Sequence, residues 1–379
     1  MTNKLYYSDA YIKEFTTKVL SVTSREDKFD VVLADTAFFP EEGGQSSDTG
    51  YIGDSKVSYV YEKDGVVHHI TDSAPKEGNV NCIIDFSVRF EKMQCHTAEH
   101  ILCGIIHRLF GYENVGFHLS DYEVVFDVDG VLTKDDIDNV ERLANEVVFE
   151  NQEILSYFPS AAELGDLKYR SKLAISDGVR LVKIGDTDLC ACCAPHVSRT
   201  GEIGIIKIID FMKHRGGTRI TMLAGRRALI DYNARYDNIK RISGMLSTPQ
   251  LQTADTLEKY IKESEANKLS LKSSRLRIAE LEADKIEITD NSAVVYFKDF
   301  EIPELIAFSN TAVNKVGKIL VTLSGEEGNY KYVISSNNTD LRALAKEINT
   351  ALAGRGGGRP EMIQGSFSST IEQIKEYFK

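Results

Sequence analysis

The sequence predicts an α+β fold in which strand-rich and helix-rich segments follow one another along 379 residues. Residues 1–85 hold short runs of alternating or β-branched residues separated by turn signals, which favours strands. The run from Phe86 to Cys103 contains no Gly or Pro and places apolar residues at helical spacing. A long helical region at residues 226–285 is expected to be interrupted near Gly244 and Pro249, and its second part, residues 250–285, contains no Gly or Pro. A chain of this length has room for two or three domains.

The N-terminal part, residues 1–85, is expected to form a small β-barrel-like domain. Its clearest strands are Tyr11–Val22 and Phe29–Leu33. The segment Thr36–Gly50 is rich in glycine and polar residues, which marks a loop with special backbone requirements. An acidic pair and Gln45 within this segment make it a candidate binding loop.

The second part, residues 86–230, is expected to be an α+β domain around the helix that begins at Phe86. Its other expected helix is Lys134–Asn151, capped by Thr133. Strands are expected at Tyr122–Val128 and Ile154–Phe158, and two further β-branched or apolar runs lie at Gly178–Gly185 and Ile203–Phe211. The segment Lys213–Arg219 is a basic turn and the densest positive stretch of the chain. It is a candidate for contact with phosphate groups.

The third and fourth parts are a helical spacer or coiled coil, residues 231–285, and an α/β domain, residues 286–379. The apolar residues of the spacer do not hold one heptad register, so a helical hairpin or a short, imperfect coiled coil is expected. The last domain should contain three strands, at Val294–Phe297, Ile319–Leu323 and Tyr332–Ser335, and a helix at Leu341–Leu352. A Gly-rich loop at residues 354–366 should let backbone N–H groups and two arginines approach a phosphate. It lacks the Lys-Ser/Thr ending of a P-loop, which argues against nucleotide hydrolysis there.

Composition excludes several classes of protein. The hydrophobic content of 42% is ordinary for a globular chain, and no run of about 18 apolar residues is present to span a membrane. The N-terminus lacks the apolar core of a signal peptide. The six cysteines cluster near histidines and are not spread as a disulfide framework, so a reducing cytoplasm is expected. The net charge of −12 argues against a broad nucleic-acid-binding face.

Two pairs of metal-ligating residue types form the strongest chemical signal. His96 and His100 lie four residues apart in the first helix, so they share one face. Cys192 and His196 form a second pair far along the chain. Together they make a tetrahedral set of three nitrogens and one sulfur, which suits Zn²⁺. A zincin metalloprotease would need a glutamate directly after the first histidine, where Thr97 stands.

Four stretches now resemble a known family. They are Phe39–Gln45, Ile84–His100, Cys192–Gly204 and Gly356–Gly365. The pattern resembles the free-standing alanyl-tRNA editing proteins of the AlaX type, in the long form that is similar to the editing and C-Ala domains of alanyl-tRNA synthetase. The chain departs from the family pattern where Glu42, Glu99 and Arg355 stand in place of the usual residues.

The resemblance implies an ATP-independent hydrolase, with one Zn²⁺ per chain, that removes serine and, as a second candidate, glycine from mischarged tRNA(Ala). The zinc would either anchor the site or lower the pKa of a water, and four protein ligands favour the anchor. The catalytic candidates are Thr97, whose hydroxyl would bond the serine hydroxyl or the attacking water, with Glu99 and Gln45. The binding candidates are Glu41, His118, Ser120, Arg199, Lys213, Arg215, Arg219, Arg355 and Arg359.

Two alternatives stay open, namely a tRNA-binding module with a purely structural zinc and a metal-dependent hydrolase of another ester. The expected partner is tRNA(Ala), with no membrane. A homodimer would form through the helical spacer or the C-terminal domain.

Overall fold

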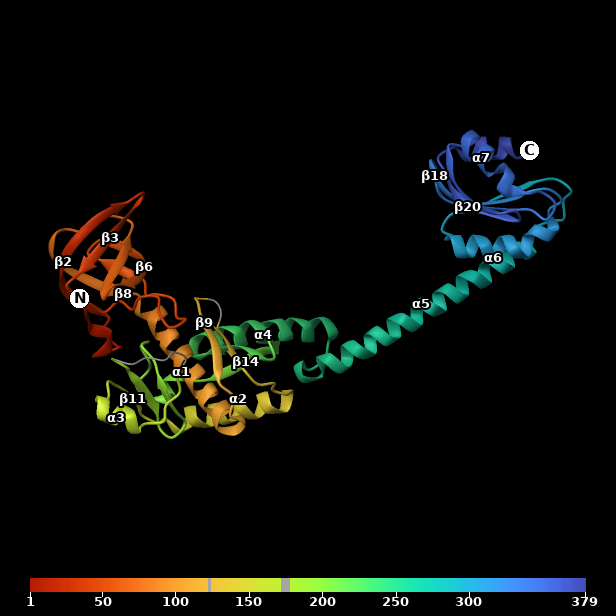
Figure 1. The fold of residues 1–379 in the computed structure, drawn as a ribbon. Coiled ribbons are helices and arrows are strands. Elements are labelled where there is room, and N and C mark those ends of the chain that lie inside the picture. The colour runs from red at the N-terminus through yellow and green to blue at the C-terminus, as the bar shows by residue number, and fades with distance from the viewer. Residues whose placement is uncertain (122–123, 172–177) are drawn as a thin grey trace. The chain divides into compact units, whose positions relative to one another are not determined.

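The computed structural model describes residues 1–121, 124–171 and 178–379. The chain divides into two compact units, Met1–Asn238 and Ile239–Lys379. Helices and several sheets occur in the same chain, so the mixed α+β class is confirmed (Figure 1). Among the described residues, no helix combines the length and the apolar character that a membrane span requires. The finer division at residues 85, 230 and 285 stays a prediction.

Six strands of the first unit close into a barrel in the order β2-β3-β7-β6-β5-β8. They are β2 (Glu14–Arg25), β3 (Lys28–Leu33), β5 (Gly50–Ile52), β6 (Ser55–Lys63), β7 (Val66–Thr71) and β8 (Gly78–Ile84). Buried and exposed residues alternate along β8, because successive side chains of a strand point to opposite faces. The inward set makes the barrel core, which includes Val31, Leu33 and Val57. A short strand pair, β1 (Asn3–Lys4) with β4 (Asp35–Thr36), lies beside the barrel.

The helix α1 (Phe86–Phe110) is the centre of the rest of this unit. Asp85 caps its first turn, and Gly111 ends it in the left-handed conformation with φ 71°. Nearly every residue between Arg89 and Ile106 is buried, so the helix has no solvent face along its middle. Helix α2 (Lys134–Glu150), with the expected Thr133 cap, packs beside it, and a short α3 (Ala161–Asp166) follows.

Two antiparallel sheets cover α1. One has the order β14-β15-β10-β9 and the other β11-β12-β13. Their strands are β9 (Asn114–Leu119), β10 (Val124–Val128), β11 (Ile154–Tyr157), β12 (Leu181–Ile184), β13 (Asp188–Ala191), β14 (Ile206–His214) and β15 (Gly217–Ala224). Tyr122 and Glu123, at the start of one expected strand, lie outside the described residues. The barrel reaches this sheet through the segment after β4, where the Leu119 N–H donates to the Gly44 carbonyl at 2.7 Å.

In the second unit a long helix leads into a five-stranded sheet. Helix α4 (Gly225–Leu246) ends near the predicted interruption, and α5 (Thr253–Asp284) begins after it. Ala279 and Ala283 of α5 pack against Phe308 of α6 (Ile302–Ala312). The sheet has the order β16-β17-β18-β20-β19, with α7 (Leu341–Ala351) and α8 (Ile371–Tyr377). Its first three strands are β16 (Ala293–Phe297), β17 (Leu320–Glu326) and β18 (Asn329–Ser335).

The expected Gly-rich loop at residues 354–366 is wrong. These residues form a hairpin of two strands, β19 (Gly354–Arg359) and β20 (Met362–Phe367). The glycines serve close packing, because a Cβ on Gly356 would lie 2.4 Å from the Tyr332 hydroxyl and 2.3 Å from the Gln364 carbonyl oxygen. Cross-strand approach, and not a phosphate cradle, therefore accounts for glycine at this position.

A buried ion pair ties the barrel to α1. Arg89 is fully buried and bonds Asp48 through Nε at 2.9 Å to both carboxylate oxygens. Its remaining nitrogens donate to the carbonyls of Ala37 and Ala10 at 2.6 and 3.2 Å. The guanidinium is thus satisfied by the segment before β2 and by the segment between β4 and β5.

We predict that Asp48→Ala lowers the free energy of unfolding of the first unit by about 3–5 kcal/mol, because it leaves a buried guanidinium without its counter-charge. Urea unfolding followed by circular dichroism measures this change. Asp138→Ala is the matched control, since it removes an exposed partner of Lys134 on α2 and should change stability little. Equal effects of the two substitutions would contradict the structural role of the pair.

Candidate metal centre

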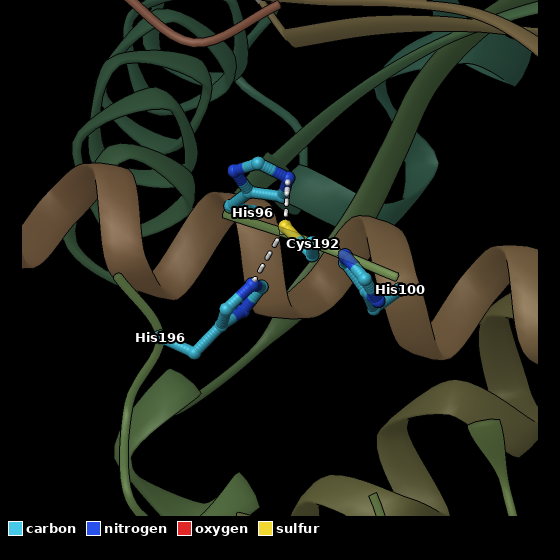
Figure 2. Close-up of side chains that lie close together, drawn as sticks. All are labelled: His96, His100, Cys192 and His196. Atoms are coloured by element: carbon cyan, nitrogen blue, oxygen red, sulfur yellow. Dashed lines mark hydrogen bonds between the residues drawn. The ribbon is translucent and has the colours of Figure 1, made fainter. Parts of the chain in front are cut away.

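Four side chains from two distant segments meet at the middle of α1. His96 and His100 project from one face of the helix, and Cys192 and His196 come from the segment after β13 (Figure 2). One ligand atom from each of the four lies within 4.8 Å of all the others. The three histidines are buried and Cys192 is half-buried. The structure therefore brings together the four residues that the sequence proposed as metal ligands.

Each histidine ring is held by a hydrogen bond at Nδ1. His96 bonds Oε1 of Gln45 at 2.8 Å, and His100 bonds Oδ2 of Asp188 at 3.0 Å. Amide and carboxylate oxygens only accept, so the proton of each ring lies on Nδ1. Nε2 is then left with its lone pair, which is the form of imidazole that binds a metal.

His196 is held by Thr97 in the same way. The Thr97 hydroxyl donates to the Met93 carbonyl at 2.7 Å, so its oxygen accepts from Nδ1 of His196 at 3.0 Å. The Val197 N–H also approaches this oxygen, at 3.4 Å. The Thr97 hydroxyl is therefore fully engaged behind a ligand, which differs from the expected position against the substrate.

The two nitrogen–sulfur distances at Cys192 are those of a tetrahedral zinc site. Cys192 Sγ lies 3.6 Å from His96 Nε2 and 3.3 Å from His196 Nε2. Zinc–nitrogen and zinc–sulfur bond lengths at a tetrahedral angle place nitrogen and sulfur about 3.5 Å apart. The residues present thus fit this ion.

The electrostatic surroundings favour the ligand forms of Cys192 and His196 but not that of His100. Burial lowers the pKa of His100, yet Cys190, Asp188 and Cys192 together raise that pKa well above its usual value, so His100 must lose a proton when a metal binds. Burial alone would raise the pKa of the Cys192 thiol, but the adjoining His96 and His196 rings hold that pKa well below its usual value. Burial lowers the pKa of His196 to about 3. A thiolate and a neutral imidazole are the states that bind a metal ion.

Arg170 supports the His100–Asp188 pair. Its Nε and Nη2 donate to the two Asp188 oxygens at 2.8 and 2.9 Å. Asp188 is buried, and His100 and Arg170 together hold the pKa of its carboxyl below the usual value against the effect of burial. The carboxylate therefore stays ionised and fixes the orientation of His100.

A cavity of about 500 Å³ opens beside the four ligands. Its walls come from α1, β9, the loop after β4 and the segments around β12 and β13, through residues that include Tyr7, Glu42, Gly43, Gly44, Glu99, Phe117, Arg170, Arg180 and Cys193. The Phe117 and His96 ring centroids are 4.6 Å apart. Gly44 has φ 83°, and a Cβ there would lie 2.4 Å from the Phe117 carbonyl oxygen. Only glycine allows the loop to lie this close to β9.

The other expected catalytic residues occupy different positions. Gln45 is fully buried behind His96 and is a support for that ligand. Glu99 lines the cavity, and its carboxylate accepts from Asn114 and Cys103. Glu41 lies beside the Tyr59 hydroxyl on the barrel, whereas its neighbour Glu42 lines the cavity.

The remaining candidates lie away from the described lining of the cavity. His118 is exposed on β9, the Ser120 carbonyl accepts from Arg227, and Arg199 donates to the Asn151 carbonyl. Arg219 pairs with Asp127 through two bonds of 2.8 Å. Four exposed cations are left as candidates for RNA, at Lys213 and Arg215 of the β14–β15 hairpin and at Arg355 and Arg359 of β19.

Several residues of the site carry no signal of their role in the sequence. Asp188, Arg170, Phe117 and Arg180 are common residue types without a motif of their own. Asp188 lies only two residues before Cys190, but nothing in the sequence indicates that its side chain faces α1. Their roles come from contacts across the fold.

Comparisons with known proteins show which families this chain is similar to. Residues 179–242 match the family described as threonyl and alanyl tRNA synthetase second additional domain, and residues 290–379 match the DHHA1 domain. The alanyl-tRNA editing protein AlaX-L of Pyrococcus horikoshii is 28% identical, over 99% of this chain and 96% of that protein. The chain is similar to AlaX-L along nearly its whole length. The expected resemblance is thereby confirmed.

Two further matches each cover only part of one of the two proteins compared. The alanine–tRNA ligase of Pyrococcus furiosus is 32% identical, over 99% of this chain but 43% of the ligase. The chain thus spans less than half of that relative. A crystal structure of the C-Ala domain from Aquifex aeolicus alanyl-tRNA synthetase covers 24% of this chain and 92% of that domain, with 19% identity and a TM-score of 0.21.

We predict that Asp188→Asn weakens divalent-metal binding by roughly 10- to 100-fold, because His100 loses the charged acceptor that orients it. Competition with a chromophoric chelator measures the affinity. Asp186→Asn, in the turn just before β13, changes an exposed carboxylate and is the control. Identical metal affinity in the two variants would show that Asp188 does not support the ligand.

Proposed function

We propose that this protein hydrolyses the ester that joins a wrong amino acid to tRNA(Ala), with serine as the main substrate and glycine as the second. It acts on the released aminoacyl-tRNA and needs no ATP. The observation that carries the proposal is a group of three histidines and one cysteine, of which His96, His100 and Cys192 line a cavity, in a chain similar to AlaX-L over 99% of its length.

Zinc is the ion we assign to His96, His100, Cys192 and His196, one per chain. When bound, it supplies positive charge that can orient and polarise the substrate. Four protein ligands already fill a tetrahedron, which favours an anchoring and electrostatic role over activation of water. Gln45, Thr97 and Asp188 are positioning residues in this scheme, because each holds one imidazole through Nδ1.

Selectivity is proposed to come from polar groups of the cavity wall. An aminoacyl ester carries an ammonium group, and the carboxylates of Glu42 and Glu99 line the same cavity as the ligands. A wall arranged to bond the hydroxyl of serine would leave polar atoms unpaired with alanine, at about 1–3 kcal/mol for each group. Both glutamates are departures from the usual family pattern, so they are the first positions to examine for a shifted substrate range.

The tRNA contacts are proposed for exposed cations at Lys213 and Arg215 in the first unit and at Arg355 and Arg359 in the second. The exposed apolar residues Leu257, Ile261 and Leu269 of α5 are the proposed contact of a homodimer. A cytoplasmic location is part of the same proposal, because all six cysteines are free.

We predict that the purified protein deacylates Ser-tRNA(Ala) faster than Gly-tRNA(Ala) and leaves Ala-tRNA(Ala) nearly intact. Cys192→Ala should reduce the rate on Ser-tRNA(Ala) by roughly 100-fold or more, because it removes the anionic ligand. Cys82→Ala alters a cysteine buried in the barrel core and is the matched control. Loss of radiolabelled amino acid from the tRNA gives the rates.

The same assay separates the competing functions. Wild-type protein that leaves Ser-tRNA(Ala) intact but cleaves another ester is a hydrolase of a different class. A Cys192→Ala variant that keeps full deacylation and loses its folded circular dichroism spectrum on mild heating points to a structural zinc. Either result contradicts the proposed function.

Substitutions of Thr97 distinguish two roles for its hydroxyl, which are positioning of His196 and direct contact with the substrate. Thr97→Val removes the acceptor for His196 at nearly constant volume, and we predict roughly tenfold slower deacylation of Ser- and Gly-tRNA(Ala) alike. Metal affinity should fall in parallel, and Thr97→Ser should restore both. A changed ratio of serine to glycine rates, with unchanged metal affinity, would instead show that the hydroxyl touches the substrate.

A further inference from the structure

Arg180 is a buried cation in the wall of the cavity that three of the four metal-ligand candidates line. It precedes β12, and only 6% of its surface is exposed. The cavity that it lines also contains His96, His100 and Cys192. No part of the mechanism proposed above uses this guanidinium.

The side chain is fixed by the segment that carries the ligands. Nη1 donates to the carbonyls of Cys192 and Ala194, at 3.0 and 2.9 Å. The Cys192 N–H donates in return to the Arg180 carbonyl at 3.0 Å. Arg180 Cζ also lies 5.5 Å from the centroid of the Tyr7 ring, which is a favourable cation–π distance. The guanidinium is therefore held in place before any ligand arrives.

Arg180 differs from the other buried arginines in having no carboxylate partner among the described residues. Arg89 pairs with Asp48, and Arg227 with Glu91. Within the described parts of the chain, no carboxylate lies at ion-pair distance from Arg180, and its buried Nε makes no hydrogen bond. A buried charge and an unsatisfied donor are both costly unless a partner compensates them. The site is thus built for an anion or another strong acceptor that enters the cavity.

The nature of the substrate decides which anion this is. An aminoacyl ester has no free carboxylate, and its amino group is positive. The nearest negative group is the phosphate on the 5′ side of the terminal nucleoside, one ribose away from the ester. The guanidinium of Arg180 donates to the backbone carbonyl of Cys192, whose thiol is one of the four candidate ligands. The guanidinium therefore lies close to the metal centre. Arginine is the side chain best suited to phosphate oxygens.

We propose that Arg180 binds the 5′-phosphate of the terminal nucleotide while the ester of that nucleotide lies against the metal ligands. The inference rests on the proposed function, since it takes an aminoacyl ester of a terminal nucleotide as the ligand. It makes Arg180 the point that sets how deep the end of the tRNA enters the cavity.

The test uses two seryl analogues of the terminal nucleoside, in which an amide replaces the scissile ester. One is 3′-deoxy-3′-(serylamino)adenosine and the other is the same compound with a 5′-phosphate. Isothermal titration on the zinc-loaded full chain should show that the phosphate tightens binding roughly tenfold or more. Arg180→Gln should abolish this advantage, so that the two analogues bind the variant equally tightly. Arg142→Gln is the control, because it changes an exposed arginine of α2, and this variant should keep the advantage.

Several results overturn the inference. Equal affinity of the wild-type protein for the two analogues does so without any variant, and so does an undiminished advantage in Arg180→Gln. Arg180→Lys keeps the charge but loses the Nε donor, and it should retain only part of the advantage. If Arg180→Gln fails to fold, a full advantage in the Lys variant also counts against the role of Nε.

Deacylation of Ser-tRNA(Ala) and binding of the analogues together distinguish failure of this inference from failure of the proposed function. A wild-type protein that deacylates Ser-tRNA(Ala) but ignores the 5′-phosphate retains that function and loses this inference. A wild-type protein that neither deacylates Ser-tRNA(Ala) nor binds either analogue loses both.

Discussion

The site depends on three hydrogen bonds, one at Nδ1 of each ligating histidine. Their acceptors come from three different places: Gln45 from the loop after β4, Thr97 from α1 itself and Asp188 from β13. Each bond sets the tautomer and the orientation of a ring, so the three Nε2 atoms converge on Cys192. The barrel, the central helix and the small sheet must therefore all be folded before four donors can face one ion.

The same requirement explains why α1 is buried along its whole middle. A helix with one exposed face could present two histidines at i and i+4 to solvent, but it could not surround both with acceptors. Burial removes water as a competitor, and it also obliges every polar group on the helix to find a partner. Lys92 shows the consequence, since its ammonium bonds the Ser47 carbonyl at 2.8 Å and Asp121 at 3.0 Å. The helix thus fixes the neighbouring loops while it carries the ligands.

Regular spacing made part of this structure predictable. The i,i+4 histidines, the Thr133 cap and the interruption between α4 and α5 are local, so residue type and spacing are enough to indicate them. The Gly-rich hairpin was misread because glycine serves equally in a phosphate loop and in close strand pairing, and only the Tyr332 ring beneath Gly356 decides between them. Asp188 and Arg180 were missed because their roles arise from packing between segments, which leaves no periodic signal in the sequence.

The distribution of arginines explains how an acidic chain can still serve a nucleic-acid substrate. Because the net charge is −12, this protein can attract RNA only at cations that are not paired with its own carboxylates. Arg89, Arg170 and Arg219 are each matched to an aspartate and contribute to folding. On the proposed function, the phosphate contacts come from Lys213, Arg215, Arg355 and Arg359, and this small number of contacts implies a shallow dependence of binding on salt. Recognition would then depend on how the aminoacylated terminal nucleotide fits the cavity more than on electrostatic attraction along the tRNA body.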